Sequence, residues 1–486
     1  MTSFNRLLRA ASAGLLVTVS VAGLASAASA QSTFSTLDRT AAGKVNFAAS
    51  ERAKPIIPGS AVNVTGEDFK PGQAVTLYYG NSAIPGASFT ADAQGKFSGS
   101  ITVPAAAVPG VHPIVVVAAN PYAASVAELK VSPDIPLSGE KGYVLTEAPA
   151  ARGLYQSAYS AKTNSLFVTS AIGRPPVRQS ELVKLDGDSL KVLAKVTPAE
   201  APAGPGGPGG PGGPGGPGAP GGAQGGPAVY AVYGVGVDDQ NGNVWVTNTR
   251  QNTVAVYKQS DLSLVKQFAP GTVNHARDVV VDQSVGKAYA SATGKPEVKV
   301  FSTATPELVK TIEIRALGRG KEFSAASLSL DPKANRLYVV SLSTGEVAVI
   351  NTKTDEVEKV FPVPGARGAI GVSHDPLTGR IYVASQGSDN LVVLDGSTGA
   401  VIADTPIGAG ALNVVFDPVK RRAYVANRGA GTIAVTDPDG KIVANLGPAP
   451  LANHVSVGKN GTVYAVDKSA GARDAESDTI LKIRPR

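Results

Sequence analysis

An all-β fold is predicted for this chain by three observations on its sequence. A short strand pattern centred on an aromatic residue returns seven times in the last two-thirds of the chain, and from Trp245 onward these aromatics are 44, 49, 44, 42 and 40 residues apart. Counts of 55 glycines and 35 prolines indicate many turns. A period near forty with several short strands per repeat is typical of a β-propeller, here with seven blades. The seven segments are Leu166–Thr169, Val244–Thr247, Ala288–Ser291, Leu337–Val340, Ile381–Ala384, Ala423–Ala426 and Val463–Val466.

The first thirty residues have the features of a secretory signal peptide. Arg6 and Arg9 precede an apolar stretch from Leu15 to Leu24, which is too short to span a bilayer comfortably. Ala28-Ser29-Ala30 then has the A-x-A form of a cleavage site. We therefore expect a signal peptide at 1–30 and a periplasmic or secreted protein without stable membrane insertion. A membrane anchor is the alternative, but no stop-transfer pattern follows the apolar stretch.

Composition narrows the chemistry that the chain can perform. It contains no cysteine, which excludes disulfides, a thiol nucleophile, and iron–sulfur or zinc-thiolate sites. The formal net charge is +7, with two of the arginines in the expected signal peptide. A charge of this size permits an anionic partner without requiring one.

Two segments are expected before the repeats. Residues 31–54 are polar and rich in small residues, and we interpret them as a linker. Residues 55–133 contain short alternating runs separated by turns, which predicts a small β-sandwich of about six or seven strands. This second segment resembles the bacterial immunoglobulin-like modules of exported proteins at Gly66–Gly72, Asp92–Gly95 and Val103–Gly110. The resemblance implies a spacer or an attachment module that can bind a partner protein.

The propeller is expected over residues 142–486, and each repeat has the same internal order. An inner strand ends in an aspartate-containing turn, the aromatic strand follows, and a third and a fourth strand complete the blade. Aspartate suits these turns because its side chain binds the following backbone. The clearest inner strands are Val235–Asp238, Val279–Asp282, Leu328–Asp331, Val372–Asp375 and Val414–Asp417.

These repeats resemble the YVTN family of β-propellers, whose repeat core reads Tyr-Val-Thr/Ala-Asn. The most similar copies are Val244–Asn248 and Tyr424–Asn427. The resemblance covers about 345 residues and implies the fold, but it says little about a reaction. Members of the family are mostly exported or surface binding proteins, and related propellers include lactonases and lyases.

The two ends of the repeat region are complementary. The last repeat ends after its third strand, Thr479–Ile483, and residues 142–147 form a strand ahead of the first inner strand. We predict that 142–147 supplies the outer strand of the last blade, which closes the ring and protects an edge.

One insertion interrupts the repeats. Residues 201–228 consist largely of Gly-Gly-Pro units without charge, and they account for the long interval between Phe167 and Trp245. Such a segment has too little to bury, so we expect it to be disordered or loosely polyproline-II-like. A tolerated surface insertion is the simpler interpretation, and a tether or lid is the alternative.

A candidate binding site follows from the loop order. In a four-stranded blade the 4→1 and 2→3 loops share one face, and here that face is rich in arginine. The position five residues before the turn aspartate should lie at the mouth of the central channel. The candidate ligand-binding residues, which suit an anionic or aromatic ligand, are Tyr155, Tyr233, His275, Arg277 and Arg367. Tyrosines that merely plug the channel, beside solvated arginines, are the alternative.

No catalytic constellation, metal-ligand set or cofactor motif is evident. The histidines lack the spacing of a metal pair, although His275 and His454 can converge from different blades. We therefore expect a non-enzymatic binding or scaffold protein whose anionic ligand is a nucleic acid, an acidic glycan or an acidic protein. A metal-dependent lactonase- or lyase-like enzyme and a cell-envelope structural or adhesion protein are the alternatives.

Overall fold

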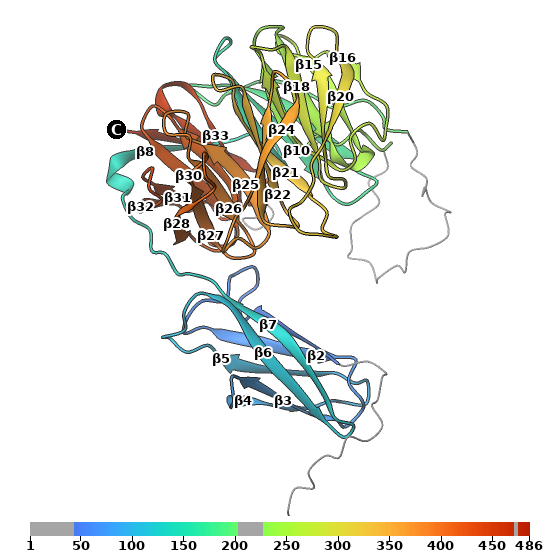
Figure 1. Ribbon diagram of the computed structural model, residues 1–486, viewed down its shortest axis with the longest axis vertical. Helices are drawn as coiled ribbons and strands as arrows, with labels where there is room; N and C mark the ends of the chain where they lie inside the picture. Colours follow the sequence, from blue (N-terminus) through green and yellow to red (C-terminus); the bar gives the residue numbers. More distant parts are fainter. Residues whose placement is uncertain (1–42, 203–226, 471–474) are drawn as a thin grey trace, which may run out of the picture. The chain divides into compact units, whose positions relative to one another are not determined.

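The computed structural model describes residues 43–202, 227–470 and 475–486. The expected signal peptide, the first part of the expected linker and most of the Gly/Pro insertion lie outside these residues. The described residues form β-strands with three short 3-10 turns (Figure 1). Among them, no helix has the length and apolarity needed to cross a membrane.

Two antiparallel sheets share one apolar core in the N-terminal region. Along Ala61–Glu67 and Ala74–Tyr79, more buried and more exposed residues alternate, as the period of two in β-structure requires. Lys44–Ala49, which falls in the expected linker, forms a strand that pairs along its whole length with the second strand of the chain. The sheets, in strand order, are β1 (Lys44–Ala49), β2 (Ala61–Glu67) and β5 (Phe97–Thr102), and β4 (Ser82–Thr90), β3 (Ala74–Tyr79), β6 (Gly110–Ala119) and β7 (Ala123–Val131).

Seven four-stranded sheets follow in the described part of the chain between Tyr143 and Pro485. The first three are β9 (Leu154–Ser160), β10 (Ser165–Ile172), β11 (Gln179–Asp186) and β12 (Val192–Val196); β13 (Val235–Asp238), β14 (Asn243–Asn248), β15 (Thr253–Lys258) and β16 (Leu264–Gln267); and β17 (Ala276–Asp282), β18 (Lys287–Ala292), β19 (Glu297–Ser302) and β20 (Glu307–Glu313). The next three are β21 (Ala325–Asp331), β22 (Arg336–Ser341), β23 (Glu346–Asn351) and β24 (Glu356–Pro362); β25 (Ala369–His374), β26 (Ile381–Ser385), β27 (Asn390–Leu394) and β28 (Val401–Pro406); and β29 (Ala411–Asp417), β30 (Arg422–Asn427), β31 (Thr432–Thr436) and β32 (Ile442–Leu446). The last is β33 (Ala452–Val457), β34 (Val463–Asp467), β35 (Thr479–Pro485) and β8 (Tyr143–Pro149).

The first strands of these sheets contact one another in a closed cycle. β9 contacts β13, each first strand contacts the next one along the chain, and β33 contacts β9 again. The first six sheets are antiparallel meanders whose later strands lie progressively farther from this inner ring, and the last sheet has β8 as its outermost strand. A ring of radial four-stranded sheets is the β-propeller architecture, as the aromatic repeats predict.

The last sheet takes its outer strand from the start of the repeat region. β8 pairs antiparallel with β35, from Thr479 opposite Pro149 to Pro485 opposite Tyr143. Tyr143 and Leu145 also pack against the apolar core of the last two sheets. The predicted closing strand is therefore present, and it spans Tyr143–Pro149 rather than 142–147.

The repeated aromatic residues join neighbouring sheets. Tyr289 donates its hydroxyl hydrogen bond to the carbonyl of Thr352 (3.0 Å), and Tyr382 donates to the carbonyl of Pro438 (2.9 Å). In both pairs the acceptor belongs to the turn between the third and fourth strands of the next sheet. In these two repeats the buried tyrosine hydroxyl has a partner in the next sheet, whereas the buried hydroxyl of Tyr424 has none among the described residues. The repeat thus marks a contact between blades.

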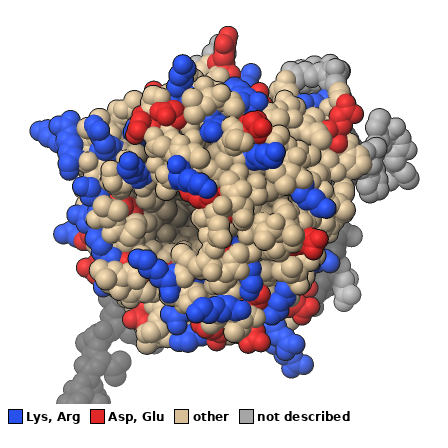
Figure 2. Space-filling view, turned by 90° about the horizontal axis from the view of Figure 1, so that it is seen from above, with Lys and Arg blue, Asp and Glu red and all other residues tan. Residues whose placement is uncertain are grey.

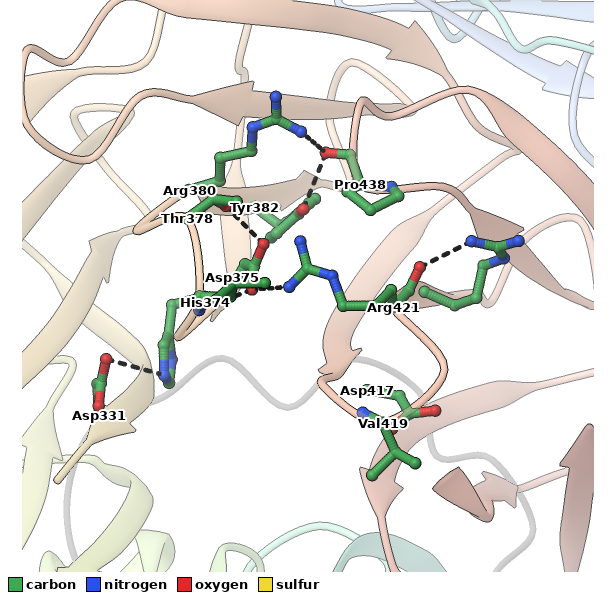
Figure 3. Close-up of polar contacts among 12 residues, drawn as sticks. Asp331, His374, Asp375, Thr378, Arg380, Tyr382, Asp417, Val419, Arg421 and Pro438 are labelled. Carbon is green, nitrogen blue, oxygen red and sulfur yellow. Dashed lines mark hydrogen bonds and ion pairs between the residues drawn. The ribbon is translucent and has the colours of Figure 1, made fainter. Parts of the chain in front are cut away.

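The turn aspartates have the role that their sequence position predicts. Asp331 accepts hydrogen bonds from the backbone N–H groups of Lys333 and Ala334, both 3.1 Å long. Asp375 accepts from the N–H of Leu377 at 3.0 Å and also from the guanidinium of Arg421, which comes from the next sheet (Figure 3). The hydrogen bonds to Arg421 and Thr378 hold the pKa of the Asp375 carboxyl below its usual value against the effect of burial. These residues stabilise the turns and the contacts between them.

Candidate functional site

A cavity of about 210 Å³ lies at one end of the inner strands. It is bordered by residues in or next to β9, β13, β17, β29 and β33, so five of the seven sheets contribute to it. Four of the five residues predicted for the site meet here. The lining residues are Tyr155, Gln156, Tyr233, Thr249, Arg250, His275, Arg277, Leu412, Asn413, Arg428, Asn453 and His454.

The predicted residue Arg367 does not line this cavity. It lies in the loop between β24 and β25, three positions before Ile370. Ile370 is the residue of this sheet that is equivalent to Tyr155. Its N–H binds the hydroxyl of Ser388 at 3.0 Å, and its carbonyl accepts from the N–H of Gly387 at 2.9 Å. These bonds hold the loop against the neighbouring loop of the same sheet, so a basic loop residue need not reach the channel.

The two predicted tyrosines form an edge-to-face pair. The ring centroids of Tyr155 and Tyr233 lie 4.6 Å apart at an interplanar angle of 75°. The ammonium nitrogen of Lys468 lies 3.3 Å from the centroid of the Tyr155 ring, and Arg250 Nε donates to the Tyr233 hydroxyl at 3.3 Å. Cations thus contact both aromatic groups, in the geometry of cation–π and hydrogen-bonding interactions. The tyrosines form an aromatic wall of the cavity beside a concentration of positive charge.

Three arginines, Arg250, Arg277 and Arg428, line the cavity. In the described part of the chain, none of them pairs with a carboxylate within 4.0 Å. Arg428 donates to Asn453 Oδ1 at 2.8 Å, whereas the buried Nε of Arg277 has no hydrogen-bond partner. Buried polar groups in native proteins are nearly always bonded, and each exception needs an explanation. In the described residues, these arginines thus have no ion-pair partner at the cavity, and the nearby charge of Asp278 acts on Arg277 without a direct contact.

Burial changes the protonation of several groups around the cavity. It lowers the pKa of Lys468 to about 7, with repulsion from Arg428 adding to the effect. It also lowers the pKa of His454 to about 3, and it lowers that of His275, where Arg250 and Arg277 contribute. These shifts favour the neutral form of both histidines at pH 7 and bring the titration of Lys468 close to neutral pH.

One carboxyl group, that of Asp278, is buried next to Arg277 in the chain. Burial raises its pKa to about 6, although hydrogen bonds from backbone N–H groups and the charge of Arg277 oppose the shift. Its two oxygens accept from the N–H of Leu328 (2.9 Å) and of Val279 (3.0 Å). Asp278 therefore binds the backbone, and it does not form an ion pair that would neutralise Arg277 within the distance above.

The lining of the cavity differs in charge from the surface that Figure 2 shows. Figure 2 looks onto the side where β15 and β16 are labelled at the top of Figure 1, and basic and acidic side chains are interspersed there around a hollow. The cavity described above instead has arginines and neutral side chains as its polar lining, with no aspartate or glutamate among its lining residues. Within the cavity itself, the charged lining residues are therefore all basic, which suits an anion.

A second polar cluster contains a serine, a histidine and an aspartate. Ser329 Oγ and His374 Nδ1 are 2.8 Å apart, while His374 Nε2 lies 3.8 Å from Asp331 Oδ2 (Figure 3 shows the latter pair). The longer distance exceeds that of a hydrogen bond. His374 also stacks on Tyr338, and burial lowers its pKa despite nearby Asp331 and Asp375. We interpret this cluster as a contact between sheets, because Asp331 is already committed to its turn.

Sequence reasoning did not place Gln156, Asn413 and His454 among the candidate binding residues, although it noted that His454 can converge with His275. Gln156, Asn413 and His454 each lie four residues before the end of the inner-strand motif, one position after the predicted set. The same alignment of repeats, moved by one residue, would have found them. The alignment of inner strands could not have indicated Lys468, because this residue follows β34. Its ammonium group nevertheless contacts the ring of Tyr155.

Comparisons with known proteins support the fold. No protein-family model matches the sequence, and no curated protein matches it. Among solved structures, the hydrazine synthase of Kuenenia stuttgartiensis is 14% identical with a TM-score of 0.53, covering 69% of this chain and 96% of that one. Virginiamycin B lyase from Staphylococcus aureus is 12% identical with a TM-score of 0.52, covering 71% and 100%. U3-55K is 10% identical with a TM-score of 0.51, covering 70% and 98%. These likenesses show the β-propeller fold alone.

Proposed function

We propose that this chain is an exported binding protein that holds an anionic ligand in the arginine-lined cavity of its propeller. In this proposal the propeller is a seven-bladed member of the YVTN type, and the N-terminal sheets are an immunoglobulin-like module that serves as spacer or attachment. Residues 1–30 direct export to the periplasm or the exterior. The strand content and the ring of sheets agree with this description, and the sequence features of the first thirty residues support export.

The observation that carries the proposal is the group of three arginines that line the cavity. Arg250, Arg277 and Arg428 converge on one small space without carboxylate partners there. Keeping like charges together raises the free energy of the unliganded protein, and an anion removes this repulsion while it gains charge-assisted hydrogen bonds. A tyrosine pair beside the arginines adds an apolar surface for the rest of the ligand.

The metal-dependent alternative has weaker support. His275 and His454 both line the cavity, as the convergence of these histidines requires. Among the described residues, however, no three histidine, cysteine, aspartate or glutamate side chains are grouped closely enough to hold a metal ion. Three protein ligands are typical of catalytic zinc sites. The likeness to a lyase extends only to the fold, so anion binding is the function that the side chains favour.

The proposal can be tested with anions of different size. We would measure binding of the purified mature chain to inorganic sulfate, to heparin and to a labelled single-stranded oligonucleotide, each at low and at moderate salt. We expect at least one of them to bind, with an affinity that falls as salt increases. The double variant Arg250→Gln/Arg428→Gln should weaken this binding at least tenfold.

A matched double variant provides the control. Lys333→Gln/Lys420→Gln removes two exposed charges from turns that follow inner strands, and it changes the net charge by the same amount. At moderate salt it should leave affinity within about twofold, since remote surface charges are then screened. Equal losses in the two double variants would show that total charge, and not the cavity, governs binding. Failure of every anion to bind at low salt would overturn the proposed function.

A further inference from the structure

Two amide side chains that line the cavity, those of Gln156 and Asn413, already accept hydrogen bonds through their oxygens. The N–H of Val235 donates to Gln156 Oε1 at 3.3 Å, and the N–H of Val455 donates to Asn413 Oδ1 at 2.9 Å. A backbone N–H cannot pair with an amide NH₂, so these bonds fix the orientation of both amides. Each side-chain NH₂ is therefore the group left for other partners. Both residues are nearly buried, with 8% exposure each.

The imidazole of His454 is oriented in the same way. Its Nδ1 lies 3.3 Å from the N–H of Ser157, which donates to it. A ring nitrogen that accepts a hydrogen bond carries no proton, and the neutral ring then carries its proton on Nε2. At the same level of the inner strands, both oxygens of Asp278 accept backbone N–H groups. The two amides and the imidazole thus have donors left for other partners, whereas the Asp278 carboxylate only accepts hydrogen bonds.

Arg277 adds the strongest donors to this set. Its guanidinium carries five N–H donors and no acceptor, and its buried Nε is unpartnered in the described part of the chain. Together with Gln156, Asn413 and His454, it surrounds the cavity from four inner strands, β17, β9, β29 and β33. A ligand that satisfies these groups must supply several acceptor oxygens pointing in different directions.

The size and walls of the cavity limit the rest of the ligand. Its volume of about 210 Å³ is below the range of roughly 300–1,000 Å³ typical of sites for drug-sized molecules. Tyr155, Tyr233 and Leu412 line it with apolar surface. A polymer cannot enter a space of this size except by one end group, whereas a single ring fits it.

We propose that the cavity binds a small organic molecule through a tetrahedral oxyanion, as in a phosphate or sulfate monoester of a ring-sized group. The oxyanion lies among Arg277, Asn413 and His454, and the ring lies against Tyr155 and Tyr233. A planar carboxylate offers two oxygens and is satisfied by one bidentate arginine, whereas donors from three strands match the three outward oxygens of a tetrahedral head. The inference rests on the proposed function, since it names the ligand class of the same site.

The test uses phenyl phosphate, phenyl sulfate and benzoate as probes of the full mature chain. Isothermal titration should show one saturable site for a phenyl ester, with benzoate at least tenfold weaker. The ratio between phenyl phosphate and phenyl sulfate tells which tetrahedral head the site prefers. Benzoate that binds as well as both esters would overturn the proposal, since a planar head would then suffice.

Two variants locate the binding. Asn413→Asp keeps an oxygen for the N–H of Val455 and replaces the remaining NH₂ by a negative oxygen. It should therefore reduce affinity more than tenfold. Arg277→Gln should also cost at least tenfold, because hydrogen bonds to charged groups are strong. Arg319→Gln is the matched control for charge, because Arg319 is exposed on the loop before β21 and does not line the cavity; it should leave affinity within about twofold.

The outcomes separate this inference from the proposed function. If heparin or the oligonucleotide binds while no phenyl ester binds or competes, the anion-binding function stands and the small-ligand inference falls. If no anion of either kind binds, both fall. Unfolding curves of each variant report whether it is folded, and if one substitution prevents folding, the other still tests the site. Equal loss in Arg277→Gln and Arg319→Gln would also overturn the inference.

Discussion

The hydroxyl of Tyr464, in the last sheet, donates a 2.7 Å hydrogen bond to the carbonyl of Gly187, in the first sheet. It is the same contact that Tyr289 and Tyr382 make with the sheets that follow theirs. Here, however, it joins residues separated by almost the whole length of the repeat region. The aromatic repeat, the contact between β33 and β9, and the pairing of β8 with β35 therefore all act at the closure of the ring.

Removing the hydroxyl of Tyr464 should destabilise the ring. Tyr464→Phe keeps the packing of the aromatic side chain, but it leaves the buried carbonyl of Gly187 without this donor. We expect the free energy of unfolding to fall by about 1–2 kcal/mol. Tyr122→Phe, at a residue that is 68% exposed, is the control and should have no effect. Chemical denaturation measures both, and identical midpoints for the two variants would contradict the role of the hydrogen bond.

Removing the closing strand should have a larger effect. Replacing Tyr143–Pro149 by a Gly/Ser segment of equal length removes the pairing with β35 and the apolar contacts of Tyr143 and Leu145. The exposed β35 would then be an unpaired edge, which also favours aggregation. We expect the melting temperature to fall by roughly 10 °C or more, as the loss of several kcal/mol implies. A calorimetric melting curve unchanged by the replacement would refute the closure.

The fold was predictable because each repeat carries its own signals. Period-two alternation, the turn aspartates and the aromatic residue recur together, and each corresponds to a physical need: a buried face, a bonded turn and a contact between sheets. The closing strand was predictable because the last repeat lacks one. The strand at Lys44–Ala49 was not predicted, because its partner Ala61–Glu67 supplies the burial that its own sequence barely indicates.

The site was predictable only where the register of the inner strands decides the position of a side chain. Tyr155, Tyr233 and Arg277 occupy equivalent places in the repeats, and the ring brings them together. Arg367 lies outside that register on a loop flanked by Gly365 and Gly368, both at positive φ (83° and 59°), where the backbone changes direction. Orientation of the Gln156 and Asn413 amides depends on hydrogen bonds between neighbouring sheets, which the sequence does not encode locally.

Neutral His454 should make the protein sensitive to acid. Its pKa is lowered from 6.5 to about 3 by burial, with Arg277 contributing, so the folded state disfavours the protonated ring. The stabilisation is complete above pH 6.5, and it is lost as pH falls toward 3, because the unfolded chain binds the proton first. His454→Asn retains an acceptor for the N–H of Ser157 and cannot titrate. Melting temperatures between pH 7 and pH 4.5 should fall less in the variant than in the natural chain; equal falls would contradict the assignment.

Lys468 should couple anion binding to proton uptake. Burial and Arg428 lower its pKa to about 7 in the unliganded protein, and an anion in the adjacent cavity favours the ammonium form and raises that pKa. Affinity is therefore highest below pH 7 and falls as pH rises from 7 to the pKa of the complex, because binding then requires a proton. Sulfate is a suitable probe, since its own charge is constant between pH 6 and pH 9. Titrations in buffers of different ionisation enthalpy should show proton uptake at pH 8 in the natural chain and much less in Lys468→Met. A pH-independent affinity in the natural chain, or the same proton uptake in Lys468→Met, would show that another group carries the linkage.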